Sequence, residues 1–101
     1  MVRRIVWSAQ ARAARDRDIA WLAERDDDAA RRRADAIDEW VEGLARRPLG
    51  TGHQWPGYLT FGDKKLNKRI VYEVFDDRIE IAAFFDMRQD TTGLPPPPRR
   101  R

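Results

Sequence analysis

Apolar and polar residues alternate in two stretches of the chain, residues 68–75 and 78–85. This period of two is typical of β-strands, whose successive side chains point to opposite faces. Asp76 and Asp77 separate the stretches, and a two-residue connection is the commonest loop of a β-hairpin. The pattern therefore predicts an antiparallel hairpin.

The hairpin has a definite expected register. The pairs that should lie opposite one another are Phe75 and Arg78, Val74 and Ile79, Tyr72 and Ile81, and Ile70 and Ala83. A shift by one residue would turn Glu73 and Glu80 toward the core, so the register is strongly specified. By parity the opposite face carries Arg69 and, if the second strand continues, Asp86 and Arg88. We expect that face to remain open.

Periodicity also predicts the remaining elements. They are a strand at 3–7, a helix from Ala9 to about Glu24 capped by Ser8, a second helix that starts at the aspartates at 26–28 and ends before Pro48, a loop at 49–57 and a strand at 58–61. On the second helix, spacings of four, three, four and three place five apolar residues on one face: Ala30, Ala34, Ile37, Val41 and Leu44. The order predicts an α+β fold: an N-terminal strand, an antiparallel helical hairpin, then a three-stranded antiparallel sheet segment.

Length and composition narrow the picture further. A chain of 101 residues suits one domain, expected over residues 1–90, and the Pro/Arg-rich residues 91–101 are expected to form a disordered tail. Cysteine is absent, which excludes disulfides and thiolate metal sites. No segment has the apolar length of a membrane span, so we expect a cytoplasmic protein. We also expect no metal or other cofactor. The net charge of +3 alone is weak support for a nucleic-acid partner.

Candidate chemistry is sparse. The single histidine, His53, lies in the Gly-rich loop, and no cysteine nucleophile, metal-ligand cluster or phosphate-binding glycine motif accompanies it. Arg69 and Arg88 flank the hairpin, where arginines can bind phosphate bidentately or stabilise charge on a phosphodiester. The alternative is that both are ordinary edge charges. Tyr72, on the predicted core face, is expected to pack rather than to catalyse.

The ordered combination of motifs resembles the RelE/ParE family of bacterial toxins over about residues 2–90. The motifs are LARRP at 44–48, KRIVYEV at 68–74, the DDR turn at 76–78, IEIAAFF at 79–85 and MRQD at 87–90. The resemblance implies the toxin of a type II toxin-antitoxin system, of the kind associated with plasmid stabilisation and growth inhibition. It further implies a small antitoxin, encoded next to the toxin, that neutralises it.

The family holds two activities. RelE-like members cut mRNA in the ribosomal A site, and the resemblance then implies catalytic roles for Arg69, Arg88 and a lysine such as Lys65. The tyrosine that usually follows the last arginine is missing here. ParE-like members inhibit DNA gyrase and need no nuclease site, although Asp86 stands where they usually have a histidine. We favour a ParE-like toxin; the alternatives are a RelE-like endonuclease and a non-toxic binding module of the same fold.

A partner surface can also be expected. An antitoxin segment should lie as a helix or strand over the helical hairpin and sheet, and it would cover Trp21 and Trp40 if these are exposed rather than internal. The residues predicted to bind the antitoxin or the target are Trp21, Trp40, Lys64, Lys68, Arg69, Asp86 and Arg88. The target itself, gyrase or ribosome-bound mRNA, does not follow from the fold.

Overall fold

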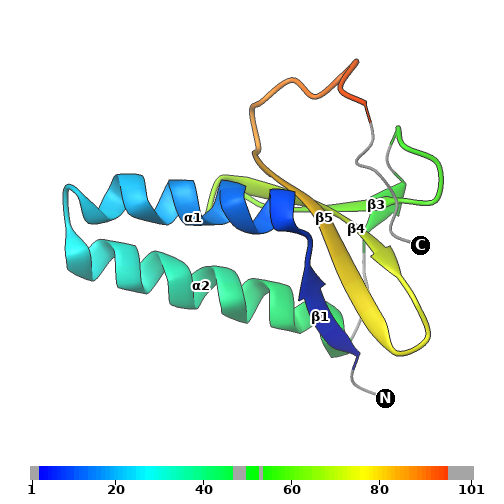
Figure 1. Ribbon diagram of the computed structural model, residues 1–101, viewed down its shortest axis with the longest axis horizontal. Helices are drawn as coiled ribbons and strands as arrows, with labels where there is room; N and C mark the ends of the chain where they lie inside the picture. Colours follow the sequence, from blue (N-terminus) through cyan, green and yellow to red (C-terminus); the bar gives the residue numbers. More distant parts are fainter. Residues whose placement is uncertain (1–2, 47–49, 53, 96–101) are drawn as a thin grey trace.

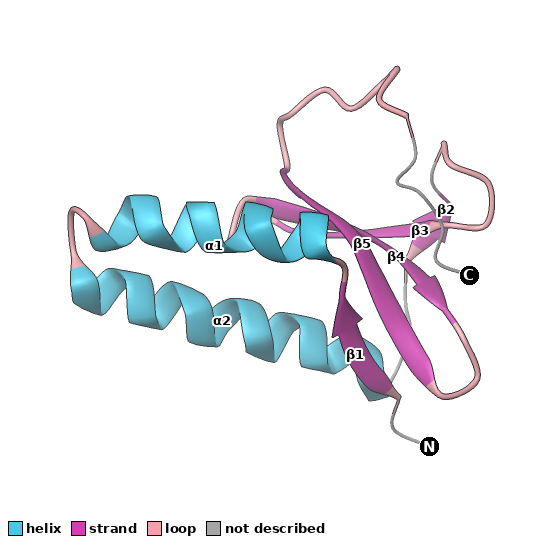
Figure 2. Cartoon of the chain, in the orientation of Figure 1, coloured by secondary structure: helices cyan, strands magenta, loops and turns pink. Residues whose placement is uncertain are grey.

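The computed structural model describes residues 3–46, 50–52 and 54–95, so His53 and residues 96–101 lie outside the described part. The elements in chain order are β1 (Arg4–Trp7), α1 (Ala9–Ala23), α2 (Asp27–Arg46), β2 (Thr51–Gly52), β3 (Leu59–Asp63), β4 (Lys68–Val74) and β5 (Arg78–Asp86). The strands form one sheet in the order β1-β5-β4-β3-β2. Figures 1 and 2 show the two helices lying side by side as an antiparallel pair next to this sheet. Neither described helix has the length and apolar character needed to cross a bilayer.

Both helices begin where the sequence predicts. Ser8 accepts the backbone N–H of Ala11 at 3.0 Å through its hydroxyl, which satisfies one of the unpaired amides at the start of α1. Asp26 does the same for Ala29 at 3.0 Å at the start of α2. The predicted apolar stripe of α2 supplies the core, because Ile37, Val41 and Leu44 are fully buried.

The predicted fold class is confirmed, and the structure adds two strand pairings. β1 pairs with β5 in parallel, so the sheet is mixed. β2 lies inside the stretch predicted as loop and pairs with the first residues of β3. A strand of two or four residues carries too little alternation to identify its partner, and so the sequence pattern could not show either pairing.

The hairpin register is confirmed only near its turn. Val74 lies opposite Ile79 and Tyr72 opposite Ile81, and the N–H of Phe75 reaches the carbonyl of Arg78 at 2.8 Å. The prediction of Ile70 opposite Ala83 is wrong, because Ile70 lies opposite Phe84. The register shifts between Val71 and Tyr72, where a β-bulge makes Ala82 an additional residue of β5.

The bulge reverses which residues of β5 face the helices. Ile81 and, beyond the bulge, Phe84 belong to the core on the helix side of the sheet. Ala83 and Phe85, which alternation without a bulge would place there, belong to a cluster on the other face. The same reversal brings Asp86 beside Lys68 on the helix side, where the uninterrupted pattern would have put it on the open face.

The second face of the sheet is not left open as predicted. Trp55 and Tyr58 pack there with their ring centroids 5.6 Å apart, and they bury Val71, Ala82 and Ala83. Both residues precede β3: Trp55 comes from the stretch predicted as loop, and Tyr58 was predicted as the first residue of the strand. The fold thus has a main core under the helices and a smaller one on the opposite face.

Candidate partner-binding groove

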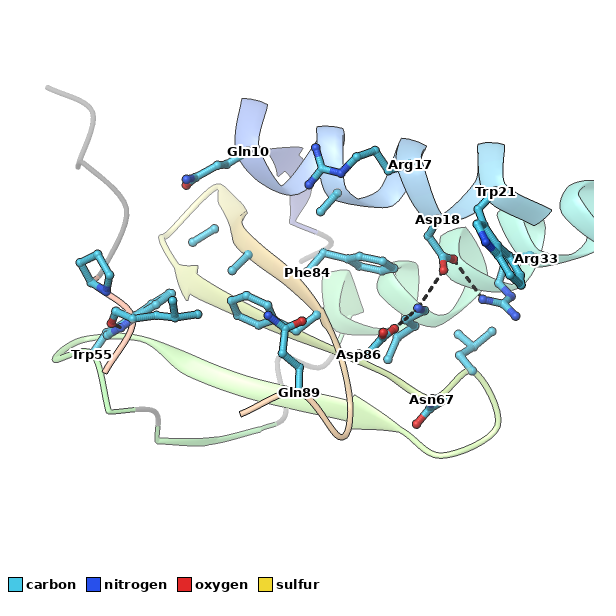
Figure 3. Close-up of a pocket in the computed structure, with 18 residues that line it drawn as sticks. Gln10, Arg17, Asp18, Trp21, Arg33, Trp55, Asn67, Phe84, Asp86 and Gln89 are labelled. Atoms are coloured by element: carbon cyan, nitrogen blue, oxygen red, sulfur yellow. Dashed lines mark hydrogen bonds and ion pairs between the residues drawn. The ribbon is translucent and has the colours of Figure 1, made fainter. Parts of the chain in front are cut away.

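A groove of about 880 Å³ lies between α1 and the segment that follows β5, here called the C-terminal segment (residues 87–95). Its floor is formed by Ala82 to Asp86 of β5. Residues of α1 form one wall, and Trp55 with residues of the C-terminal segment forms the other (Figure 3). The α1 wall consists of Gln10, Ala14, Arg17, Asp18 and Trp21.

One end of the groove holds a compact network of charges. Asp18 accepts the ammonium of Lys68 at 2.8 Å and the guanidinium of Arg33 at 3.0 Å. Lys68 also forms an ion pair with Asp86 at the end of β5. The network therefore joins both helices to the sheet (Figure 3).

Lys68 is held as a buried cation. Only 8% of its side chain is exposed, and burial by itself would lower its pKa. The hydrogen bonds and charges of Asp18 and Asp86 act in the opposite direction and raise the pKa of Lys68 above its ordinary value. Lys68, predicted to contact a partner or target, thus has its charge satisfied inside the protein.

Arg69 is engaged on the other face of the sheet. Its guanidinium donates to the hydroxyl of Thr91 at 3.1 Å and to the carbonyl of Gln89 at 3.3 Å. Two further donors fix the same segment: the side-chain amide of Gln54 reaches the carbonyl of Thr91 at 2.7 Å, and the indole of Trp55 reaches the carbonyl of Leu94 at 3.0 Å. The first residues of the predicted disordered tail, Thr91 to Leu94, are therefore tied to the domain.

The other predicted cations are exposed. Lys64 and Lys65 lie in the turn between β3 and β4, and Arg88 lies in the turn after β5. None of these three residues lines the groove, and Arg69 does not line it either. Lys65 instead borders a second hollow beside Trp40. The groove is thus not lined by Arg69, Arg88 and Lys65, the predicted nuclease set.

The two candidate tryptophans differ. Trp21 is 58% exposed at one end of the groove, with the guanidinium of Arg25 stacked 3.9 Å from its ring centroid. Trp40 packs against the core and stacks on Phe61 with ring centroids 5.9 Å apart. Trp21 is consequently the one that offers substantial apolar surface to a partner.

Both tyrosines of the chain are buried. Tyr72 has no exposed surface and Tyr58 is 5% exposed. Burial raises the pKa of Tyr72 to about 12, since the phenolate would be desolvated. This confirms Tyr72 as a packing residue.

The groove itself was not predicted from the sequence. Its α1 wall follows from a helical stripe at 10, 14, 17 and 21, spaced four, three and four residues apart. Because that stripe contains two polar residues, its pattern does not indicate an apolar helix face. Asp18, Arg33 and Trp55 were missed as well, because their partners lie far away in the sequence.

Comparison with solved structures and families gives the class of protein first. The fold matches the structure described as "Chromosomal ParDE TA system from P. aeruginosa", with 18% identity over 82% of this chain and 94% of that chain and a TM-score of 0.73. It also matches "The structure of YoeB dimer from Staphylococcus aureus", with 21% identity, the same two coverages of 82% and 94%, and a TM-score of 0.52. The likeness to both confirms the expected RelE/ParE-type fold.

The family follows from the sequence itself. The model described as "ParE toxin of type II toxin-antitoxin system, parDE" matches residues 5–91. The chain belongs to this family of toxins. No curated protein matches the sequence.

Proposed function

We propose that this protein is a ParE-like toxin that acts in the cytoplasm by inhibiting DNA gyrase, and that an antitoxin encoded next to it neutralises it. The observation that carries the proposal is the state of the basic residues. Lys68 is enclosed by Asp18 and Asp86, and Arg69 is tied to the C-terminal segment. Two cations that could serve a RelE-like cleavage are therefore occupied, and the exposed Lys65 and Arg88 do not line the groove.

Proton transfer points the same way. General acid-base catalysis needs a titratable group within hydrogen-bond reach of the reacting atoms. Tyr58 and Tyr72 are both buried, and Asp18 and Asp86, which raise the pKa of Lys68, stabilise its protonated form. A protein that blocks its target by binding needs none of these groups, and this favours gyrase inhibition within the family to which the chain belongs.

The groove supports the antitoxin partner. It combines an exposed tryptophan with a floor of apolar residues from β5, which is the composition of a peptide-binding surface. The chain carries a net charge of +3, so an acidic antitoxin would be attracted to it. An antitoxin that occupies this groove would keep the toxin silent.

A RelE-like endonuclease is the second candidate function. It is favoured by Arg69 and Arg88, which stand at the start of β4 and just after β5, where the resemblance to those enzymes expects arginines. Both could stabilise a phosphodiester if the C-terminal segment released Arg69. A non-toxic binding module of the same fold is the third hypothesis.

Controlled expression in a bacterium separates these functions. Growth arrest with an SOS response and trapped gyrase-DNA complexes is the expected result, and co-expression of the antitoxin should restore growth. In-frame cuts in ribosome-bound mRNA, lost in Arg69→Ala and Arg88→Ala variants, would support the endonuclease instead. Normal growth despite confirmed soluble toxin would contradict both and leave the binding module.

A further inference from the structure

The second hollow, which Lys65 borders, is lined by α2, by β3 and by the turn between β3 and β4. It has a volume of about 410 Å³. Its lining includes Glu39 and Trp40 from α2 and Phe61 and Asp63 from β3. None of these four residues lines the groove between α1 and the C-terminal segment. The second hollow is therefore a separate feature of the surface.

A pair of aromatic rings forms the apolar part of this hollow. The rings of Trp40 and Phe61 are stacked, with their centroids 5.9 Å apart and an angle of 28° between their planes. Both side chains pack against the core, and both remain partly exposed. Leu66 from the turn adds apolar surface beside them. Aromatic surface of this kind binds the guanidinium of an arginine or the apolar stem of a lysine.

Carboxylates without ion-pair partners accompany this apolar surface. Asp35, Glu39 and Glu42 are spaced four and three residues apart on α2, so they follow one face of the helix. All three are exposed, and none of them forms an ion pair within the described part of the chain. Asp63, which borders the hollow, forms none there either. Lys65 is the one cation among the described residues that line the hollow, so the surface is negative.

This negative charge limits which partners the surface can bind. The carboxylates would repel RNA and DNA, and they would equally repel the acidic antitoxin considered above. In a symmetric dimer the same carboxylates would face one another, because such an interface brings identical surfaces together. A protein surface that carries arginines or lysines is the partner whose charge fits.

We infer that this surface, here called the acidic face (Asp35, Glu39, Trp40, Glu42 and Phe61), docks on a basic surface of the target enzyme, DNA gyrase. The inference rests on the proposed function. An enzyme that binds DNA presents arginines and lysines to the phosphates, so it carries a surface of the required charge. One such side chain would stack on the aromatic pair while its charged group meets the carboxylate of Glu39.

Leu66 connects the acidic face to the groove proposed for the antitoxin. This residue lines both the second hollow and the groove. A protein segment bound in the groove would therefore lie beside the hollow, and the rest of that protein would obstruct a target on the acidic face. Target docking and neutralisation thus use two neighbouring surfaces rather than one shared surface.

A charge reversal at Glu39 tests the docking surface with purified toxin and purified gyrase. Glu39→Lys should raise the Kd for gyrase about tenfold, and the concentration that half-inhibits supercoiling should rise by the same factor. Glu39→Gln removes the charge without reversing it, so its effect should be smaller, about threefold.

The matched control is Asp76→Lys. It reverses the charge of an exposed carboxylate in the turn of the hairpin, outside the second hollow. This variant should bind and inhibit gyrase as the wild type does. All of the variants should keep the affinity of the wild type for the antitoxin, which reports that the fold and the groove are intact.

The outcomes separate this inference from the proposed function. If the wild type inhibits gyrase and Glu39→Lys inhibits it equally well, the acidic face is not the docking surface, and the proposed function stands. Equal weakening by Glu39→Lys and Asp76→Lys would show a general effect of net charge and would overturn the inference. Loss of antitoxin affinity in Glu39→Lys would overturn it as well. If the wild type neither binds nor inhibits gyrase, the proposed function fails, and the docking inference fails with it.

Discussion

Replacing Lys68 by methionine tests whether the charge network holds the helical hairpin to the sheet. Methionine keeps much of the length and apolar character of the stem and removes the ammonium. Asp18 then loses its 2.8 Å partner, and Asp86 loses its ion pair. A buried ion pair that loses one member usually costs about 3–5 kcal/mol.

The expected cost here is smaller, for two structural reasons. Asp18 keeps Arg33 at 3.0 Å, and the side chain of Asp86 is 58% exposed, so water can hydrate its carboxylate. We therefore expect the free energy of unfolding to fall by about 2–3 kcal/mol. For a domain of this size that corresponds to a decrease in Tm of about 10–20 °C.

Chemical denaturation and thermal unfolding followed by circular dichroism measure this change. Lys65→Met is the matched control, because Lys65 is an exposed lysine in the adjacent turn and its loss should cost less than about 0.5 kcal/mol. Adding Asp18→Asn to form a double-mutant cycle should reveal a coupling of about 1–2 kcal/mol between Lys68 and Asp18. If Lys68→Met were as stable as Lys65→Met, the network would not stabilise the fold.

Four further predictions concern stability and binding. The pKa of Lys68 is raised in the folded protein. The difference in free energy of unfolding between wild type and Lys68→Met should therefore have its full size below the ordinary lysine pKa of about 10.4 and should shrink as the pH rises through the folded-state pKa. A difference that changes between pH 6 and 9 would contradict this. Gly43→Ala should stabilise by about 0.5–1 kcal/mol, because an added Cβ in this helix meets no atom within 4 Å. Gly50→Ala should destabilise the fold by at least about 2 kcal/mol, since the added Cβ would lie 2.7 Å from the carbonyl of Thr60 and the φ of Gly50 is +153°. Chemical denaturation measures both glycine variants, and a change of the same sign in their free energies of unfolding would contradict these predictions. Trp21→Ser should change the Tm by less than about 3 °C, because the ring is exposed, yet weaken antitoxin binding at least about tenfold in calorimetric titration; unchanged affinity would exclude Trp21 from the interface.

Local sequence patterns were sufficient to predict the two helices and the turn of the hairpin. Ser8 and Asp26 cap the helices as their residue types predict, and the apolar stripe of α2 forms the core. The bulge could not be located, because Ala82 and Ala83 are followed by Phe84 and Phe85. Since each pair repeats one residue type, the alternation of apolar and polar positions does not show which residue of β5 is the additional one.

The candidate site was harder to predict than the fold. The alternation of β4 places Lys68 on the same face as the core residues. The carboxylate of Asp18 that satisfies its charge comes from a different element, α1. Arg69 was expected on an open face, yet it contacts Thr91 in a segment whose composition suggested a tail. Both outcomes depend on contacts between residues distant in sequence, which period and propensity do not encode.

A supercoiling assay with purified DNA gyrase and increasing amounts of this protein tests gyrase inhibition most directly. Supercoiling should be inhibited and cleaved gyrase-DNA complexes should accumulate, and both effects should be reversed when the antitoxin is added. Unchanged gyrase activity, together with cleavage of ribosome-bound mRNA by the same preparation, would contradict it.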